Sequence, residues 1–215
     1  MQQPLAVILG AGPGIGLATG RRFAEEGFRV ALVCRPEESL AAFREVLDGG
    51  LVLGADLGSP TWLKEALAAI ETWRGFPRVV VYNASAGFPG PAEALTPAQA
   101  AADLQVNVLS ALAGAQWALP SMKAAGRGTL LFTGGGLGLK PKPGLASGSL
   151  GKAALRSLAL SFAEELEPLG IHAATVTVRG FVQPGSALAP EHVAQCFWDV
   201  HAQLPGSWDR ERVLP

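Results

Sequence analysis

A glycine-rich turn between an apolar run and a helical pattern is the feature that most constrains the fold of this chain. The apolar run covers residues 5–9, and residues 10–16 then read GAGPGIG. A helical pattern over 14–26 follows and leads into a second apolar run at 29–34. Strand, glycine turn, helix and strand follow one another in this order. The glycines allow the backbone to turn tightly and to approach a pyrophosphate, which binds at the N–H groups of the helix start. The pattern therefore predicts a dinucleotide site. Its residues at the turn are Gly10, Gly12, Pro13, Gly14, Ile15 and Gly16.

Strand-like and helix-like segments alternate along the whole chain. Short apolar runs rich in Val, Leu and Ile predict strands at 5–9, 29–34, 50–54, 78–82, 128–133 and 172–178. Helical patterns lie between and after them at 14–26, 37–47, 60–73, 97–124, 147–167 and 190–203. This alternation predicts an α/β fold, a Rossmann-type doubly wound parallel sheet with helices on both faces. We expect a single domain over 1–215, because no shift in composition divides the chain and its length suits one well-buried core.

Composition limits the partners and the compartment. The formal net charge is −1, so no basic field indicates a nucleic acid or an acidic membrane. Cys34 and Cys196 are too few and too far apart for a disulfide framework or a metal site, which favours a reducing, cytoplasmic compartment. The first residues lack a charged segment followed by an apolar one, so we expect no signal peptide. The uncharged stretch at 104–122 contains Gln, Asn and Pro, which favours a buried amphipathic helix over a membrane span.

The residues just after each predicted strand lie where a doubly wound sheet binds its ligand. In this chain they are rich in glycine and in polar side chains. They comprise the glycine turn, Cys34-Arg35, Ala55-Asp56-Leu57, Asn83-Ala84-Ser85-Ala86-Gly87, Thr133 with Gly134-Gly135-Gly136, and Arg179-Gly180-Phe181-Val182.

With these residues the chain resembles the short-chain dehydrogenase/reductase family over nearly its whole length. The glycine turn matches the glycine motif of the family, Asp56-Leu57 its adenine-binding pair, and residues 83–87 its NNAG segment. Within a matching long helix at 104–122, Asn107 falls on the active-site asparagine. Segment 128–135 matches the strand that ends in the catalytic serine, and in 147–166 Lys152 matches the lysine of the YxxxK motif. The resemblance implies oxidoreduction of a small carbonyl or alcohol with a nicotinamide dinucleotide.

Two side chains on which the family relies for catalysis are missing. The tyrosine position falls on Gly148, and the one tyrosine of the chain, Tyr82, lies elsewhere. The serine position falls on Gly134 or Gly135, depending on a one-residue choice in the alignment. In these respects the chain is similar to a subset of the family that lacks the tyrosine and keeps the lysine. We also expect a shortened substrate lid after 172–178 and no last strand before the end at Pro215.

The resemblance also implies which residues bind the cofactor. Arg35 lies where the family reads the adenosine ribose, and an arginine there favours the 2′-phosphate of NADP(H) over the free hydroxyl of NAD(H). Pro13 weakens this preference, because relatives that use NADP often carry a basic residue in its place. The expected cofactor residues are Gly10, Gly12, Pro13, Gly14, Ile15, Gly16, Arg35, Asp56, Leu57, Asn83, Ala84, Ser85, Lys152 and Val182.

Asn107 and Lys152 are the expected catalytic residues, with Thr133 and Ser149 as candidates to replace the missing hydroxyls. Ser149 also fits a role as a helix cap. Glycine at 148 offers no proton to a developing alkoxide, so two hypotheses stay open. One is a divergent oxidoreductase in which a water between Lys152 and Asn107 relays the proton. The other is an inactive nucleotide-binding relative that senses redox state or serves as a partner subunit.

Two further expectations concern topology and assembly. A third hypothesis is that the chain is a methyltransferase or a nucleoside-binding protein of similar topology. This hypothesis is weaker, because it does not account for the presence of Asn83, Asn107 and Lys152 together. The segments 97–124 and 147–167 are apolar enough to form the homodimer or homotetramer that is common in the family.

Overall fold

The computed structural model describes residues 3–35, 40–47 and 49–215. In this part of the chain seven parallel strands form one sheet in the order β3-β2-β1-β4-β5-β6-β7. This arrangement confirms the predicted doubly wound α/β sheet. The strands are β1 (Leu5–Leu9), β2 (Arg29–Cys34), β3 (Leu51–Gly54), β4 (Val79–Tyr82), β5 (Gly128–Gly135), β6 (Ile171–Val178) and β7 (Glu211–Leu214).

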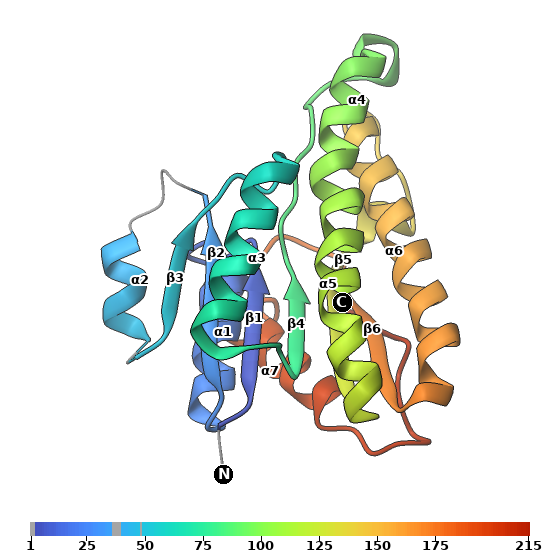
Figure 1. Ribbon diagram of the computed structural model, residues 1–215. Helices are drawn as coiled ribbons and strands as arrows, with labels where there is room; N and C mark the ends of the chain where they lie inside the picture. Colours follow the sequence, from blue (N-terminus) through green and yellow to red (C-terminus); the bar gives the residue numbers. More distant parts are fainter. Residues whose placement is uncertain (1–2, 36–39, 48) are drawn as a thin grey trace.

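Helices cover both faces of the sheet. Figure 1 shows α3, α5 and α6 in front of the sheet, with α1 and α7 behind it. The front helices contribute Leu67, Ala115 and Leu155 to one buried cluster, and α1 and α7 contribute Phe23 and Phe197 to a second cluster on the opposite face. The helices are α1 (Ile15–Glu25), α2 (Leu40–Val46), α3 (Pro60–Arg74), α4 (Pro97–Leu104), α5 (Ser110–Ala125), α6 (Ala146–Leu166) and α7 (Pro190–His201).

Local sequence explains where two of these helices begin. Ser59 caps α3 by accepting a hydrogen bond from the backbone of Trp62. Thr96 and Gln99 form a capping box at the start of α4, and a proline occupies the first turn of both helices. The predicted helix over 37–47 is observed from Leu40, and its residues 37–39 lie outside the described part of the chain.

The predicted continuous helix over 97–124 is divided. A π-helical turn at Gln105–Leu109 separates α4 from α5. In this turn the hydroxyl group of Tyr82 donates to the carbonyl oxygen of Val106, and the side chain of Asn107 is buried against another segment. Such turns widen a helix by one residue and often mark functional sites. The division therefore places Asn107 toward the interior rather than along an ordinary helix face.

The expectation that the chain lacks a last strand is wrong. β7 (Glu211–Leu214) pairs in parallel with β6 at the edge of the sheet. Its sequence, ERVL, is too short and too charged to read as a strand on its own. The charge of Glu211 is balanced in the fold, because Arg156 donates from Nε to both carboxylate oxygens at 2.9 Å and Thr177 donates at 2.7 Å.

The carboxyl ends of the strands share one edge of the sheet, above which α4 and the start of α6 rise (Figure 1). The loops that follow β1, β4, β5 and β6 meet at this edge. Between β6 and α7 a short segment, residues 179–189, contains no helix. None of the helices in the described ranges is both long enough and apolar enough to cross a membrane.

Candidate functional site

The glycine turn after β1 is shaped by a close approach to the loop after β4. Gly10 has φ +90°, and a Cβ atom at this residue would lie 2.3 Å from the backbone nitrogen of Ala84. Asn83 fixes the contact, because its backbone N–H donates to Leu9 at 2.8 Å and its side-chain amide donates to the Gly10 carbonyl at 2.8 Å. Gly16 is equally confined, since a Cβ there would lie 2.6 Å from the Ala11 Cα. These two glycines hold the turn against its neighbours.

Gly12 and Gly14 face open space instead. No described heavy atom outside their immediate chain neighbours lies within 4 Å of a Cβ built on either residue. Gly14 is the N-cap of α1, and Pro13 is exposed between the two glycines while Ile15 begins the helix. The start of α1 is therefore open to an approaching group. Backbone N–H groups and the helix dipole favour an anion at such a position.

The ends of β2 and β3 lie beside this turn. The backbone N–H of Ala55 donates to the Cys34 carbonyl at 2.8 Å, which keeps the segment after β3 next to Arg35. Arg35 is exposed, and Asp56 is exposed with its carboxylate accepting from the backbone N–H of Gly58 at 2.8 Å. Leu57 is buried. The structure thus places Arg35, Asp56 and Leu57 next to one another at the carboxyl ends of β2 and β3.

A chain of hydrogen bonds connects the glycine turn with Lys152. The Lys152 ammonium donates to the Thr133 carbonyl at 2.8 Å, and the Thr133 hydroxyl donates to Asn83 Oδ1 at 2.9 Å. Asn83 in turn donates to Gly10. Burial lowers the pKa of Lys152 to about 8, because the charged form loses solvation. Four of the predicted site residues, Gly10, Asn83, Thr133 and Lys152, are therefore one connected group.

Asn107 positions the loop after β4 through both atoms of its side-chain amide. Its Oδ1 accepts from the backbone N–H of Ala86 at 3.0 Å, and its Nδ2 donates to the Ala86 carbonyl at 2.7 Å. A Cβ on Gly151 would lie 2.4 Å from Asn107 Nδ2, so α6 needs a glycine there to pack. Ser85 precedes Ala86 and is exposed. Asn107 thus joins this loop to α6.

Gly148 lies close to Leu137 and to the backbone of Gly87. A Cβ on Gly148 would lie 3.3 Å from Leu137 Cδ1, and a Cβ on Gly87 would lie 3.5 Å from the Gly148 Cα. Tyr82 cannot serve this region, because it is fully buried on β4 and its hydroxyl is bound to the backbone of the π-helical turn. Desolvation raises its pKa above the usual value.

Gly134 and Gly135, the two alternatives for the serine position, face different surroundings. A Cβ on Gly135 would lie 3.4 Å from Lys152 Cγ, in ordinary contact with the lysine stem. A Cβ on Gly134 would lie 2.5 Å from Thr177 Oγ1 and 2.6 Å from Thr175 Oγ1. Position 135 is therefore the one whose side chain would face Lys152.

The candidate hydroxyl groups have other partners. Ser149 is buried and donates to the Leu145 carbonyl at 2.8 Å, within its own helix. The Thr133 hydroxyl is occupied by Asn83. Val182 is partly buried in the segment after β6, where it packs against the cluster beneath α7.

Two residues of the site were not anticipated from the sequence. Asp103 accepts a hydrogen bond from the backbone N–H of Phe88 at 2.8 Å and another from the Ser147 hydroxyl, so it ties α4 to the start of α6. Leu137 lies in a short 3-10 helix after β5 and covers Gly148. Asp103 lies one turn before Asn107 on the same predicted helix, which was the available signal; nothing in the sequence around Leu137 marks it.

Comparisons with known proteins agree with this geometry. A family model described as short chain dehydrogenase matches residues 4–188. Oxidoreductase asL5 of Sarocladium schorii is 36% identical over 169 residues, which are 77% of this chain and 67% of that protein. Glucose 1-dehydrogenase of Gluconobacter oxydans is 30% identical over 184 residues, which are 83% of this chain and 69% of that protein.

A similar solved structure covers nearly the whole chain. It is a metagenomic short-chain oxidoreductase in complex with NADP, with a TM-score of 0.86 and 29% sequence identity. The match covers 98% of this chain and 96% of that one.

Proposed function

This chain belongs to the short-chain dehydrogenase family of oxidoreductases, and from this premise we propose that it binds NADP(H) and acts as a divergent reductase with an incomplete acid site. The observation that carries the proposal is the open start of α1 at Gly12 and Gly14, in a turn whose Gly10 is joined by hydrogen bonds through Asn83 and Thr133 to Lys152. One end of this path suits a pyrophosphate and the other end suits a reacting group.

The residues at the carboxyl ends of the strands would bind two different parts of a dinucleotide. The glycine turn would bind the pyrophosphate, and Arg35 with Asp56 and Leu57 would hold the adenosine half. Lys152 would lie near the nicotinamide ribose, with Val182 beside the nicotinamide. The bound cofactor supplies a hydride. The similar metagenomic oxidoreductase is described in complex with NADP, which supports this choice of ligand.

The chain lacks the usual side chain that would donate a proton during carbonyl reduction. Reduction of a carbonyl leaves negative charge on its oxygen, and a positioned acid contributes typically about 10²–10⁴-fold. Gly148 has no acidic group, and the apolar Leu137 covers it. Lys152 stays largely protonated at pH 7, because its pKa of about 8 lies above that pH. It can therefore stabilise the oxyanion or donate through a water, and we expect slow turnover.

An inactive nucleotide-binding relative is the second candidate function. It is favoured by the lack of an acidic group at Gly148, where the atom nearest to a Cβ belongs to the apolar Leu137. Each amide atom of Asn107 already makes one hydrogen bond with Ala86, which leaves one further hydrogen-bonding position on each for a relaying water. NADPH consumption across a panel of ketones and aldehydes separates the two candidates, because both predict nucleotide binding and only the first predicts turnover.

Arg35 tests the choice between cofactors. A charge-assisted arginine–phosphate contact contributes about 1.5–3 kcal/mol, or roughly ten- to a hundred-fold in affinity. We expect NADPH to bind more tightly than NADH by this factor in titration calorimetry, and we expect Arg35→Asp to reverse the order. Arg21→Asp, a change at an exposed arginine on α1, is the matched control. Equal affinities for the two cofactors in the unmodified protein would contradict the role of Arg35.

We also propose a cytoplasmic homodimer. Leu109 is 49% exposed and Leu150 is 45% exposed, and they lie on the two helical segments that the family commonly uses for assembly. Burial of both leucines would remove an exposed apolar surface. Light scattering of the purified protein gives the mass directly, and a monomer at micromolar concentration would contradict this proposal.

A further inference from the structure

Arg179 lies directly beside the reacting end of the site. The register of β5 and β6 ends at the pair Gly135 and Val178, so Arg179 is the first residue beyond the paired strands. A Cβ built on Gly136 would lie 3.1 Å from the Arg179 Cα and 3.6 Å from its Cβ. The backbone and Cβ of Arg179 therefore lie against Gly136, the residue after Gly135, and a Cβ on Gly135 would face Lys152.

Lys140 is also held next to Gly136, by a backbone hydrogen bond. Its backbone N–H donates to the Gly136 carbonyl at 2.9 Å, which closes the turn after β5. Both Lys140 and Arg179 are exposed. Lys152 donates to Thr133 two residues before Gly135. Three cationic side chains thus originate around a single short stretch of backbone.

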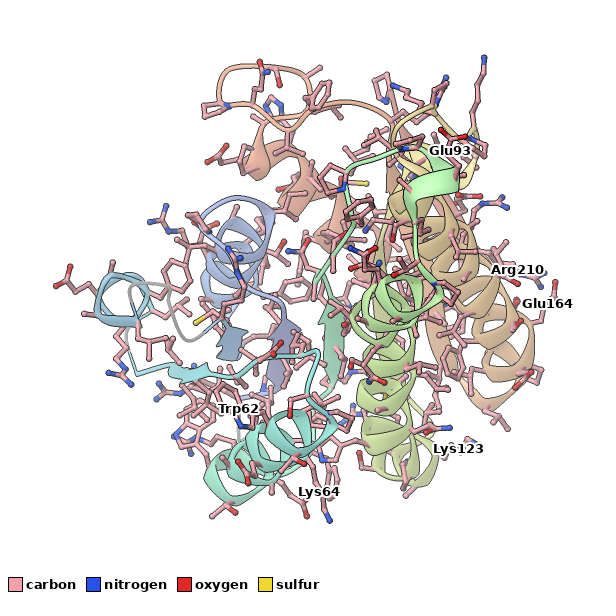
Figure 2. The ribbon with its side chains drawn as sticks, turned by 90° about the horizontal axis from the view of Figure 1, so that it is seen from above. Trp62, Lys64, Glu93, Lys123, Glu164 and Arg210 are labelled. Carbon is pink, nitrogen blue, oxygen red and sulfur yellow. The ribbon has the colours of Figure 1, made fainter. Side chains whose placement is uncertain are left out.

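Two side-chain carboxylates near this stretch are already engaged. Asp103 accepts from Phe88 and Ser147, and Glu211 accepts from Arg156 and Thr177. The ion pairs found among the described residues involve other arginines, such as Arg210 with Glu164 on the outer side of α6 (Figure 2). They are formed by Arg22, Arg156, Arg210 and Arg212.

Among the described residues neither Arg179 nor Lys140 forms an ion pair. Positive charge of this kind beside a site attracts an anion. A guanidinium group is well suited to a carboxylate, because its N–H donors match the two oxygens. A substrate whose carbonyl lies near Gly135 and Gly148 would place a neighbouring group within reach of Arg179. A neutral substrate would make no use of the arginine.

We propose that the substrate is a carbonyl compound carrying a carboxylate close to its reacting carbon, and that Arg179 recognises this carboxylate with the exposed Lys140 as a second cation nearby. This inference rests on the proposed NADP(H)-dependent function. It assigns Arg179 to substrate specificity, separately from the cofactor residues at the glycine turn and from Arg35.

Binding of a matched pair of probes tests the assignment without requiring turnover. The probes are phenylglyoxylate and its methyl ester, which share the ketone and the ring and differ in the charge. We would titrate each into NADP⁺-saturated protein and follow binding by ligand-observed NMR. We expect the acid to bind roughly ten-fold or more tightly than the ester, as for a charge-assisted contact, and the difference to shrink as salt is added.

Arg179→Gln should remove most of the preference for the acid while leaving NADP⁺ affinity unchanged, and Arg179→Lys should retain part of it. Lys123→Gln is the control for loss of one positive charge. This exposed lysine lies near the C-terminal end of α5, at the rim of the molecule in Figure 2, and should leave the preference intact.

The possible failures are distinguishable. Absence of NADP⁺ binding in the unmodified protein would refute the proposed function. Normal NADP⁺ binding with equal affinity for acid and ester, or an unchanged preference in Arg179→Gln, would overturn the role of Arg179 alone. A loss of NADP⁺ affinity in Arg179→Gln as large as the loss for the acid would show that the arginine reads the cofactor, and would also overturn it.

Discussion

Leu137 occupies space that a side chain at position 148 would need. A Cβ at this position would already lie 3.3 Å from Leu137 Cδ1, so a larger group requires the leucine to move. A tyrosine there would share the helix face of Lys152, four residues later. We therefore expect Gly148→Tyr alone to raise turnover only weakly, and Gly148→Tyr combined with Leu137→Ala to raise it by roughly 10²-fold, the general-acid contribution.

NADPH consumption across a carbonyl panel measures this gain, and Leu137→Ala alone is the control. The prediction fails if the double variant binds NADPH normally and gains nothing. Rapid turnover by the unmodified protein would instead indicate that another group already supplies the proton, with a water held by Lys152 as the first candidate.

The two glycines at the end of β5 should respond oppositely to serine. Gly135→Ser places its Cβ in ordinary contact with the Lys152 stem, so we expect little change in the free energy of unfolding. Gly134→Ser forces a Cβ to within 2.5 Å of Thr177 Oγ1 and 3.1 Å of its Cα, and overpacking of this kind costs about 1–3 kcal/mol. Urea unfolding of the pair measures the difference. Equal stabilities would show that the strands adjust freely.

Motif spacing was sufficient to predict some residues of the site and insufficient for others. The glycine turn, Asn83 and Lys152 belong to segments whose spacing along the chain determines their place at the sheet edge. Leu137 and Asp103 act through contacts with distant segments, and such contacts leave no local pattern. The hydrogen bonds that occupy Asn107 likewise depend on the loop after β4.

At the scale of elements, different glycines at the junction of β1 and α1 contribute to ligand binding and to the stability of the fold. Gly14 faces open space, and Gly16 packs against Ala11. We expect Gly14→Val to abolish NADPH binding with a modest effect on unfolding, because the side chain fills the space that a pyrophosphate needs. Gly16→Val should destabilise the fold, because its Cβ would lie 2.6 Å from the Ala11 Cα.

Calorimetry with NADPH and thermal unfolding measure both properties on each variant. Normal NADPH affinity in Gly14→Val would mean that the turn is only structural. A Gly16→Val protein as stable as the unmodified one would show that α1 can shift away from β1 without loss.

Element order was predictable because apolar runs and helical periodicity alternate clearly. The π-helical turn and β7 were not. The turn depends on Tyr82, which contacts it from the sheet, and on Ala86, which binds its Asn107 from the loop after β4. β7 depends on Arg156, which neutralises Glu211 from α6. In both cases a partner far away in the sequence decides the local conformation.

For the whole molecule, the partly buried His201 and the buried His172 predict loss of stability in acid. Desolvation, with the charges of Arg78 and His172, lowers the pKa of His201 from 6.5 to about 4. The unfolded chain therefore binds more protons between these values. The contribution of His201 is present above about pH 6.5 and is lost as the pH falls toward 4, by about 2–3 kcal/mol. Desolvation also lowers the pKa of His172, which adds to the effect.

Urea unfolding at pH 7.5 and pH 4.5 measures the loss. His201→Gln should make the two values more similar, whereas His192→Gln should not, because His192 is exposed. An unchanged difference in His201→Gln would assign acid sensitivity to other groups.

The position of β7 has a practical consequence for anyone who handles this protein. The Leu214 carbonyl accepts the backbone N–H of Arg179 at 3.2 Å, and the Pro215 carbonyl would lie 3.9 Å from a Cβ on Gly180. The last residues of the chain thus support the base of the segment that carries the proposed substrate arginine. An affinity tag joined directly to Pro215 would begin beside Gly180, so ligand preference should be compared before and after its removal. A tag at the other terminus, or a long flexible spacer, avoids this proximity.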